Sequence, residues 1–97
     1  MLEFDAVVSF QWDEGNTRKN AGKHDVSQAE AEQVFFNEPL LVAEDVKHSG
    51  MEHRLHALGK TDTGRSLHVT FMLRQNGSLI RVISARDMSR KERKYFE

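Results

Sequence analysis

Basic side chains gather in the last quarter of this 97-residue sequence. Arg86 ends an apolar stretch, and Arg90, Lys91, Arg93 and Lys94 follow within two helical turns. Guanidinium groups make bidentate, charge-assisted hydrogen bonds to phosphate oxygens, so this spacing suits a phosphate site. Runs of charged residues of this kind are also common on solvent-exposed helices at chain ends. The cluster therefore indicates either a phosphate site or a solvated amphipathic helix.

Polar residues also share one side of the stretches before this cluster. Alternation of polar and apolar residues places Arg54 and His56 on one face of a predicted strand, and His68 on one face of the next. The following strand adds Arg81 or Arg86, depending on its register. Arginines and histidines side by side on a sheet can bind a phosphodiester and move a proton. The exposed face of an ordinary half-buried antiparallel sheet gives the same alternation.

Length and composition limit the class of protein. Ninety-seven residues predict a single domain, 1–97, with a modest core. There is no cysteine, which excludes disulfides, thiolate metal sites and a cysteine nucleophile. No apolar run approaches the roughly 18 residues of a membrane span. Glu3 and Asp5 stand where a signal peptide would carry positive charge. We expect a soluble, cytoplasmic protein.

The net charge of −1 conceals two halves of opposite sign. Residues 25–52 carry seven acids and one base, whereas residues 53–97 carry ten bases and four acids. A segregated positive half favours an anionic ligand or an acidic protein partner, unless the fold interleaves the two halves in space. None of the five histidines has the i, i+4 helical partner of a zinc protease, so no metal site and no cofactor is predicted.

The hydrophobic pattern predicts an α+β fold. Turn signals, including Asn76-Gly77, separate the later strands by short connections, which makes them antiparallel. Ser27 with Glu30 forms a capping box at the start of a helix. The expected elements are a strand over 4–12, helices over 13–23 and 27–36, strands over 40–46, 52–59, 65–74 and 79–85, and a helix over 89–97. The order is strand–helix–helix, then a four-stranded antiparallel meander, then a C-terminal helix.

The last strand and helix have specific signals of their own. The stretch 79–85 is apolar on both faces, which predicts a central strand or one that is covered twice. Ser89 with Glu92 is a second capping box and opens the final helix. Tyr95 and Phe96 are expected to pack back on the sheet.

Several short motifs occur together in an order that resembles the BrnT family of bacterial toxins over nearly the whole chain. The last of them, Arg81-Val82-Ile83-Ser84-Ala85-Arg86 followed by Ser89-x-x-Glu92-Arg93-x-x-Phe96-Glu97, is the most specific. The others are Trp12-Asp13, Asn20 with Lys23-His24, Ala31-x-x-Val34-Phe35 with Pro39, His48-Ser49 with Glu52-x-Arg54, Gly59, Gly64-Arg65-x-Leu67-x-Val69 and Arg74.

The resemblance implies a RelE-like fold and a metal-independent endoribonuclease that inhibits translation. It also implies a partner, a small ribbon-helix-helix antitoxin of the BrnA type encoded beside the toxin. The complex is expected to repress its own operon and to contact operator DNA only through the antitoxin. A different class remains open: a non-catalytic module that binds the ribbon-helix-helix protein and acts only in repression. A stand-alone DNA-binding domain is not favoured, since helix-turn-helix spacing is missing.

Cleavage without a metal would use the ribose 2′-hydroxyl as the nucleophile, which requires positive charge on the phosphorane, a base and an acid. We predict that Arg54 and Arg86 supply charge in the transition state. Arg65 and Arg81 would position phosphate. Because arginine is a poor proton donor, electrostatic stabilisation should carry most of the rate effect.

Candidates for proton transfer remain open. His56, Glu52 or Lys23 could be the base, and His68 or Tyr95 the acid. The predicted RNA-binding residues are Arg65, His68, Arg81, Arg90, Arg93 and Lys94. The final helix could contact RNA, the antitoxin or both, and the acidic segment 25–52 is expected to lie away from RNA.

Three positions depart from the family pattern. Asp25 replaces the glycine that usually follows Lys-His, which puts a tight turn in question because aspartate tolerates left-handed geometry less well. Gln28 stands where an aromatic residue is common, and Asn16 stands where lysine is usual. None of these changes removes the arginines of the last strand.

Overall fold

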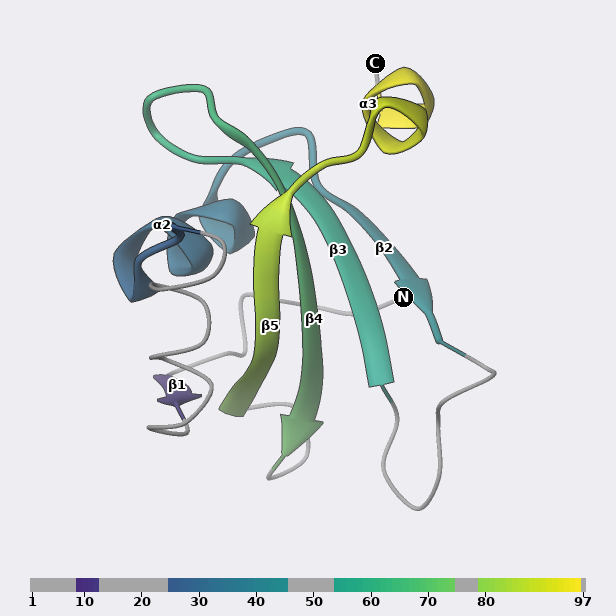
Figure 1. Ribbon diagram of the computed structural model, residues 1–97. Coiled ribbons are helices and arrows are strands. Elements are labelled where there is room, and N and C mark those ends of the chain that lie inside the picture. The colour runs from purple at the N-terminus through teal and green to yellow at the C-terminus, as the bar shows by residue number, and fades with distance from the viewer. Residues whose placement is uncertain (1–8, 13–24, 46–53, 75–78, 97) are drawn as a thin grey trace.

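The computed structural model describes residues 9–12, 25–45, 54–74 and 79–96. In these ranges a five-stranded sheet has α2 on one face, and α3 lies beyond one end of the strands (Figure 1). The predicted helix over 13–23 lies outside the described residues. The elements are β1 (Ser9–Trp12), α2 (Gln28–Gln33), the 3-10 helix η3 (Val34–Phe36), β2 (Leu41–Glu44), β3 (Arg54–Lys60), β4 (Ser66–Arg74), β5 (Leu79–Asp87) and α3 (Arg90–Phe96).

The sheet order is β1-β5-β4-β3-β2. Strands β2 to β5 each pair antiparallel with the next, as the meander prediction required. Strand β1 pairs with β5 in parallel, with Ser9 opposite Leu79, and makes the fifth strand. Strand β5 is therefore an inner strand with a neighbour on each side, as its apolar pattern indicated.

Helix α2 begins at the predicted capping box. The Ser27 hydroxyl accepts from the Glu30 backbone N–H at 3.1 Å, and the Glu30 carboxylate accepts from the Ser27 backbone N–H at 3.1 Å. The helix tightens into η3 for its last turn, so the expected helix over 27–36 is confirmed with a 3-10 end. Ala31, Val34 and Phe35 are buried, as their spacing predicted.

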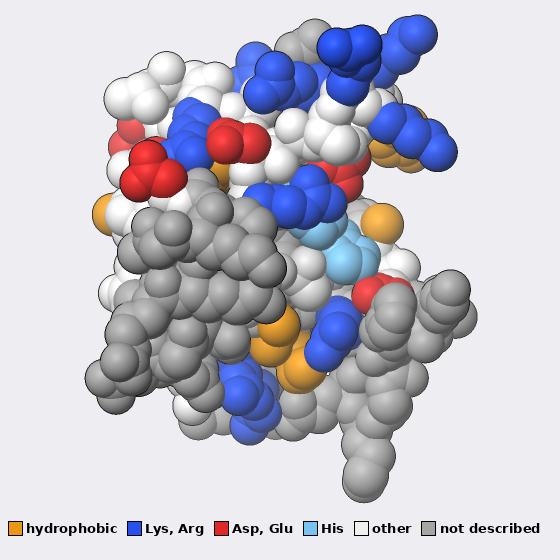
Figure 2. Space-filling view, in the orientation of Figure 1, with side chains coloured by type: hydrophobic (Ala, Val, Ile, Leu, Met, Phe, Trp, Pro, Cys, Tyr) orange, Lys and Arg blue, Asp and Glu red, His pale blue; other side chains and the backbone are white. Residues whose placement is uncertain are grey.

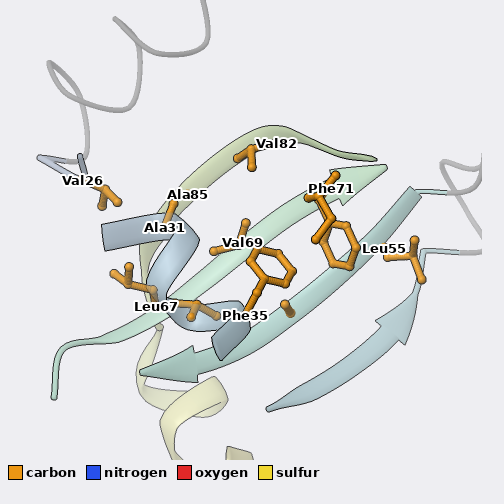
Figure 3. Packing of buried hydrophobic residues seen from close by; sticks show 12 residues of the cluster. Val26, Ala31, Phe35, Leu55, Leu67, Val69, Phe71, Val82 and Ala85 are labelled. Atoms are coloured by element: carbon orange, nitrogen blue, oxygen red, sulfur yellow. The ribbon is translucent and has the colours of Figure 1, made fainter. Parts of the chain in front are cut away.

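The core lies between the sheet and these helices, on what we call the helix face (Figure 3). The Phe35 and Phe71 rings meet edge to face with centroids 5.0 Å apart. Gly59 permits the close approach of η3, since a Cβ there would lie 2.7 Å from Cγ1 of Val34. The strand residues of the core are Leu55, Ala57, Leu67, Val69, Phe71, Ile80, Val82 and Ala85.

Strand β5 meets its prediction by its inner position alone, because Arg81 and Ser84 on the face away from the core are only half-buried. One expectation for the C-terminal region was wrong. Tyr95 does not pack back on the sheet, since 79% of it is exposed, whereas Phe96 is half-buried. Helix α3 has no fully buried residue, so little apolar burial holds it in place. In the described parts of the chain, no helix has the length and hydropathy of a membrane span.

Candidate functional site

A bulge in β5 brings the predicted arginines to one face of the sheet. Arg81 and Arg86 are five residues apart, so a regular strand would point them to opposite faces. The pairs Phe71–Val82 and Thr70–Ser84 leave Ile83 as an extra residue between them. After the bulge, Arg86 pairs with His68 while Arg81 pairs with Met72. Both arginines consequently lie on the face opposite the core.

We call this face the polar face and define it by the paired residues Arg54–Met72–Arg81, His56–Thr70–Ser84 and Leu58–His68–Arg86. Arg54 and Arg86 share the face, as predicted, but not the same row. Their rows are separated by four residues of β4, which is roughly 13 Å along the strand. The polar face therefore presents positive charge on both sides of its histidines, along a track rather than at one point.

His56 lies at the centre of the polar face and is fixed through both ring nitrogens. Its Nε2 lies 2.9 Å from Oδ2 of Asp45, and its Nδ1 lies 3.0 Å from the hydroxyl of Thr70. Because a carboxylate only accepts, Nε2 carries the hydrogen, and in the neutral ring Nδ1 accepts from Thr70. Asp45 belongs to the acidic segment that was expected to lie away from RNA, and the structure places it beside His56.

His68 stacks beside His56, with ring centroids 4.8 Å apart and the rings tilted by 33°. Its side chain is 11% exposed. Burial, followed by the positive charge of Arg86, lowers the pKa of His68 from 6.5 to about 4. His68 is therefore unprotonated near neutral pH, which argues against its predicted role as the acid.

Arg86 forms a two-bond ion pair with Glu92 of α3. Nη1 donates to Oε1 at 2.8 Å and Nη2 donates to Oε2 at 3.0 Å. The hydrogen bonds from Arg86, followed by that from the Ser89 backbone N–H, outweigh burial and lower the pKa of Glu92 from 4.5 to about 2. The same carboxylate lies 3.9 Å from Nε2 of His68. This pair joins the start of α3 to the end of β5.

Arg65, a predicted RNA-binding residue, is not brought to the polar face. Its Nε and Nη2 donate to the two carboxylate oxygens of Asp87 at 2.8 and 3.0 Å. Its Nη1 donates to the Asp25 carbonyl at 2.8 Å and to Glu30 at 3.1 Å. These bonds raise the pKa of Arg65, the largest contribution coming from Asp87. Arg65 ties β4 and β5 to the segment that opens α2, on the helix face.

The predicted RNA-binding residues of α3 lie on its surface. Arg90, Arg93 and Lys94 are exposed. Figure 2 shows the histidine side chains in the middle of the polar face, with Lys and Arg side chains on either side and more of them gathered over α3. The structure therefore places the basic end of the chain next to the polar face.

Some predicted residues lie outside the described part of the chain. The structure says nothing of Glu52 or Lys23, two of the three candidate bases. Within the described ranges, no group of three or more His, Cys, Asp or Glu residues is arranged to hold a metal ion.

Asp45 and Glu92 are the site residues that sequence reasoning missed. Glu92 was interpreted only as part of a capping box, and the structure shows that one carboxylate both caps α3 and binds Arg86. Asp45 had a weaker signal: it lies near the end of the predicted strand over 40–46, whose neighbour along the chain contains His56. The register of these two strands decides whether the two residues meet.

Comparisons with known proteins identify the family of this chain. The profile of a family described as the ribonuclease toxin BrnT of type II toxin–antitoxin systems matches residues 12–92. This span covers most of the chain, so the protein belongs to a family of ribonuclease toxins. That family is BrnT, as the sequence motifs predicted, and membership in a type II system implies an antitoxin partner.

One solved structure supports the fold. The crystal structure of the Brucella abortus ribonuclease toxin BrnT is similar with a TM-score of 0.65 and 24% sequence identity, over 87% of this chain and all of that one. At this identity the likeness shows the fold alone. A comparison with curated proteins gave no match.

Proposed function

We propose that this protein is the toxin of its type II module, a metal-independent endoribonuclease that cleaves RNA on the polar face and so inhibits translation. The observation that carries this proposal is the register of β3, β4 and β5. It places Arg54, Arg81 and Arg86 on the same face as His56 and His68. Cleavage by the adjacent ribose 2′-hydroxyl requires positive charge around the phosphate and a group that transfers a proton. Arginines on either side of histidines meet both requirements.

Arg86 is the best candidate for charge stabilisation of the phosphorane, because it is the arginine paired with His68 in the sheet. Arg54 and Arg81 lie together in the row of Met72, two rows away from Arg86. We therefore assign them to another phosphate of the same RNA strand. This revises the prediction that Arg54 and Arg86 grip one phosphate, since their rows are roughly 13 Å apart. Arg65 is left out of the proposed site because its guanidinium is bonded on the helix face.

His56 is our candidate base among the described residues. The Asp45 carboxylate holds the Nε2–H, so Nδ1 is the nitrogen able to accept a proton once the Thr70 hydroxyl turns away. The ring would then become an imidazolium, which Asp45 stabilises. Glu52 and Lys23 remain alternative bases. With His68 unprotonated, Tyr95 is the remaining candidate for the acid that protonates the 5′-leaving oxygen. We propose that Arg90, Arg93 and Lys94 extend the RNA-binding surface along α3.

The partner we propose is a ribbon-helix-helix antitoxin of the BrnA type, and the complex would repress its own operon. A RelE-like fold remains our expectation for the complete chain. The alternative, a non-catalytic partner of the ribbon-helix-helix protein, makes the opposite prediction for purified protein, because it would bind the antitoxin without cleaving RNA.

The test is cleavage of a labelled oligoribonucleotide by the purified full-length chain in EDTA, with Arg86→Ala and Arg65→Ala as matched variants. We expect wild type to cleave and to leave a 2′,3′-cyclic phosphate. Arg86→Ala should lower kcat by about a hundredfold, the usual effect of losing one charge-stabilising contact. Arg65→Ala should keep the wild-type rate at a temperature where circular dichroism shows it folded.

The two functions give different results in this assay. Failure of wild type to cleave RNA, with antitoxin binding intact, would support the non-catalytic module. Cleavage only after Mg²⁺ is restored would reject metal independence. Full activity of Arg86→Ala would remove Arg86 from the site.

A further inference from the structure

The Arg86 guanidinium keeps one of its edges available while Glu92 holds the other. Glu92 binds the two terminal nitrogens end-on, and Nη1 also donates to the Asp87 carbonyl at 3.0 Å. These bonds leave Nε–H and the second N–H of Nη2, which point the same way in a planar guanidinium. No described residue accepts a hydrogen bond from this edge. Two parallel donors of this kind match two oxygens of a phosphate.

Glu92 is itself fixed by the start of α3. Its Oε1 accepts from the Ser89 backbone N–H at 2.8 Å, and its own N–H donates to the Ser89 hydroxyl at 3.2 Å. The carboxylate is 24% exposed and the Arg86 side chain 38% exposed, so solvent still reaches the pair. The first turn of α3 thus fixes the position of the Glu92 carboxylate, and that carboxylate fixes the plane of the Arg86 guanidinium.

Arg65 shows the alternative use of the same chemistry. There Asp87 takes the Nε and Nη2 edge, and the Asp25 carbonyl and Glu30 take Nη1. The edge that Arg86 keeps is therefore consumed in Arg65. A carboxylate bound end-on to Nη1 and Nη2 leaves the Nε and Nη2 donors available for two phosphate oxygens. A carboxylate bound side-on to Nε and Nη2 occupies those donors.

We propose that Glu92 is a positioning residue, which holds Arg86 end-on so that its Nε and Nη2 edge receives an RNA phosphate beside His68. This inference rests on the proposed function and assigns Glu92 a part in it. The opposite interpretation of the same contact is that Glu92 competes with phosphate for Arg86 and must leave before RNA binds.

The two interpretations predict opposite effects of removing the Glu92 charge on the rate of the chemical step. Removing the Glu92 charge also removes repulsion of RNA, so binding should be unchanged or tighter in either case. Under positioning, however, the guanidinium loses its fixed plane and the chemical step slows. Under competition, Arg86 is released and the chemical step is at least as fast as in wild type.

The experiment compares Glu92→Gln with Ser89→Ala in the full chain. Ser89→Ala is the matched control, because it removes the other half of the capping box and leaves the Arg86–Glu92 contact. We expect Glu92→Gln to lower kcat by about tenfold to a hundredfold without raising KM, as misplacement of a catalytic group does. Ser89→Ala should stay within about twofold of wild type, far less than misplacement costs. Wild-type or faster cleavage by Glu92→Gln, or an equal loss in Ser89→Ala, would overturn the proposal.

A second measurement does not depend on cleavage. The Nε–H resonance of Arg86, assigned by its loss in Arg86→Lys, is followed by NMR as a non-cleavable 2′-O-methyl oligoribonucleotide is added. We expect it to shift in wild type and Ser89→Ala and to stay unmoved in Glu92→Gln. No shift in wild type would overturn the proposal even in a protein that cleaves RNA. In a protein that cleaves nothing, a shift in wild type and Ser89→Ala that is lost in Glu92→Gln would support positioning while the nuclease proposal fails.

Discussion

Arg86 and Asp87 are neighbours in β5, yet they point to opposite faces of the sheet and each completes a different ion pair. Asp87 binds Arg65 on the helix face, where the pair is also bonded to the segment that opens α2. Arg86 binds Glu92 on the polar face, next to two histidines. Guanidinium and carboxylate groups thus tie elements together on both faces. We propose that the helix face supplies stability and that the polar face supplies the chemistry.

The largest expected effect is on the helix face. Phe71 is fully buried and packs against Phe35, so Phe71→Ala should lower the free energy of unfolding by about 3–5 kcal/mol. Arg86→Ala, on the partly exposed polar face, should cost at most about 1 kcal/mol. Urea unfolding followed by circular dichroism gives both values. Equal losses in the two variants would remove the division between the faces.

A pH dependence of stability should come from His68. Its pKa is about 4 in the folded protein against 6.5 for a free side chain, so the unfolded chain takes up a proton first as the pH falls. Stability should therefore be lost between pH 6.5 and 4, by up to about 3 kcal/mol, and be unaffected by this group above that range.

His68→Gln is the control for this prediction, since glutamine does not titrate. The difference in unfolding free energy between pH 7 and pH 4.5 should be smaller in His68→Gln than in wild type. An identical difference in the two proteins would show that His68 is not buried as a neutral group.

The smallest predicted effect again lies on the helix face. Asp25 has a φ of 54°, the left-handed region that costs a side chain roughly 1–2 kcal/mol. Glycine relieves this strain but loses about 0.5–1 kcal/mol more conformational entropy on folding. Asp25→Gly should therefore stabilise the protein by about 0.5 kcal/mol without changing RNA cleavage. A lower melting temperature in Asp25→Gly would contradict the predicted gain.

Local patterns predicted much of this fold. Alternation fixed the faces of β3 and β4, because each residue points opposite to its neighbour and one face is buried. Both capping boxes formed where the sequence placed them. The left-handed geometry that was questioned at Asp25 is present, with a φ of 54°.

The parts that could not be predicted depend on contacts between distant segments. Nothing in the sequence marks Ile83 as the extra residue of a bulge, although that residue decides where Arg86 points. Tyr95 looks apolar enough to pack, but the short helix α3 turns it outward. Asp45 meets His56 only because of the register of their hairpin. Predicting the site therefore required strand register, which periodicity alone does not give.

The division between the two faces is tested most directly by locating the surface that RNA contacts. Backbone amide and histidine resonances are recorded by NMR as a 2′-O-methyl oligoribonucleotide is titrated into the wild-type protein. We expect the resonances of the His56 and His68 imidazoles and of the β3 to β5 amides to shift, while the amide resonances of α2 stay in place. Shifts confined to α2 and the Arg65–Asp87 pair, with both imidazoles unmoved, would contradict it.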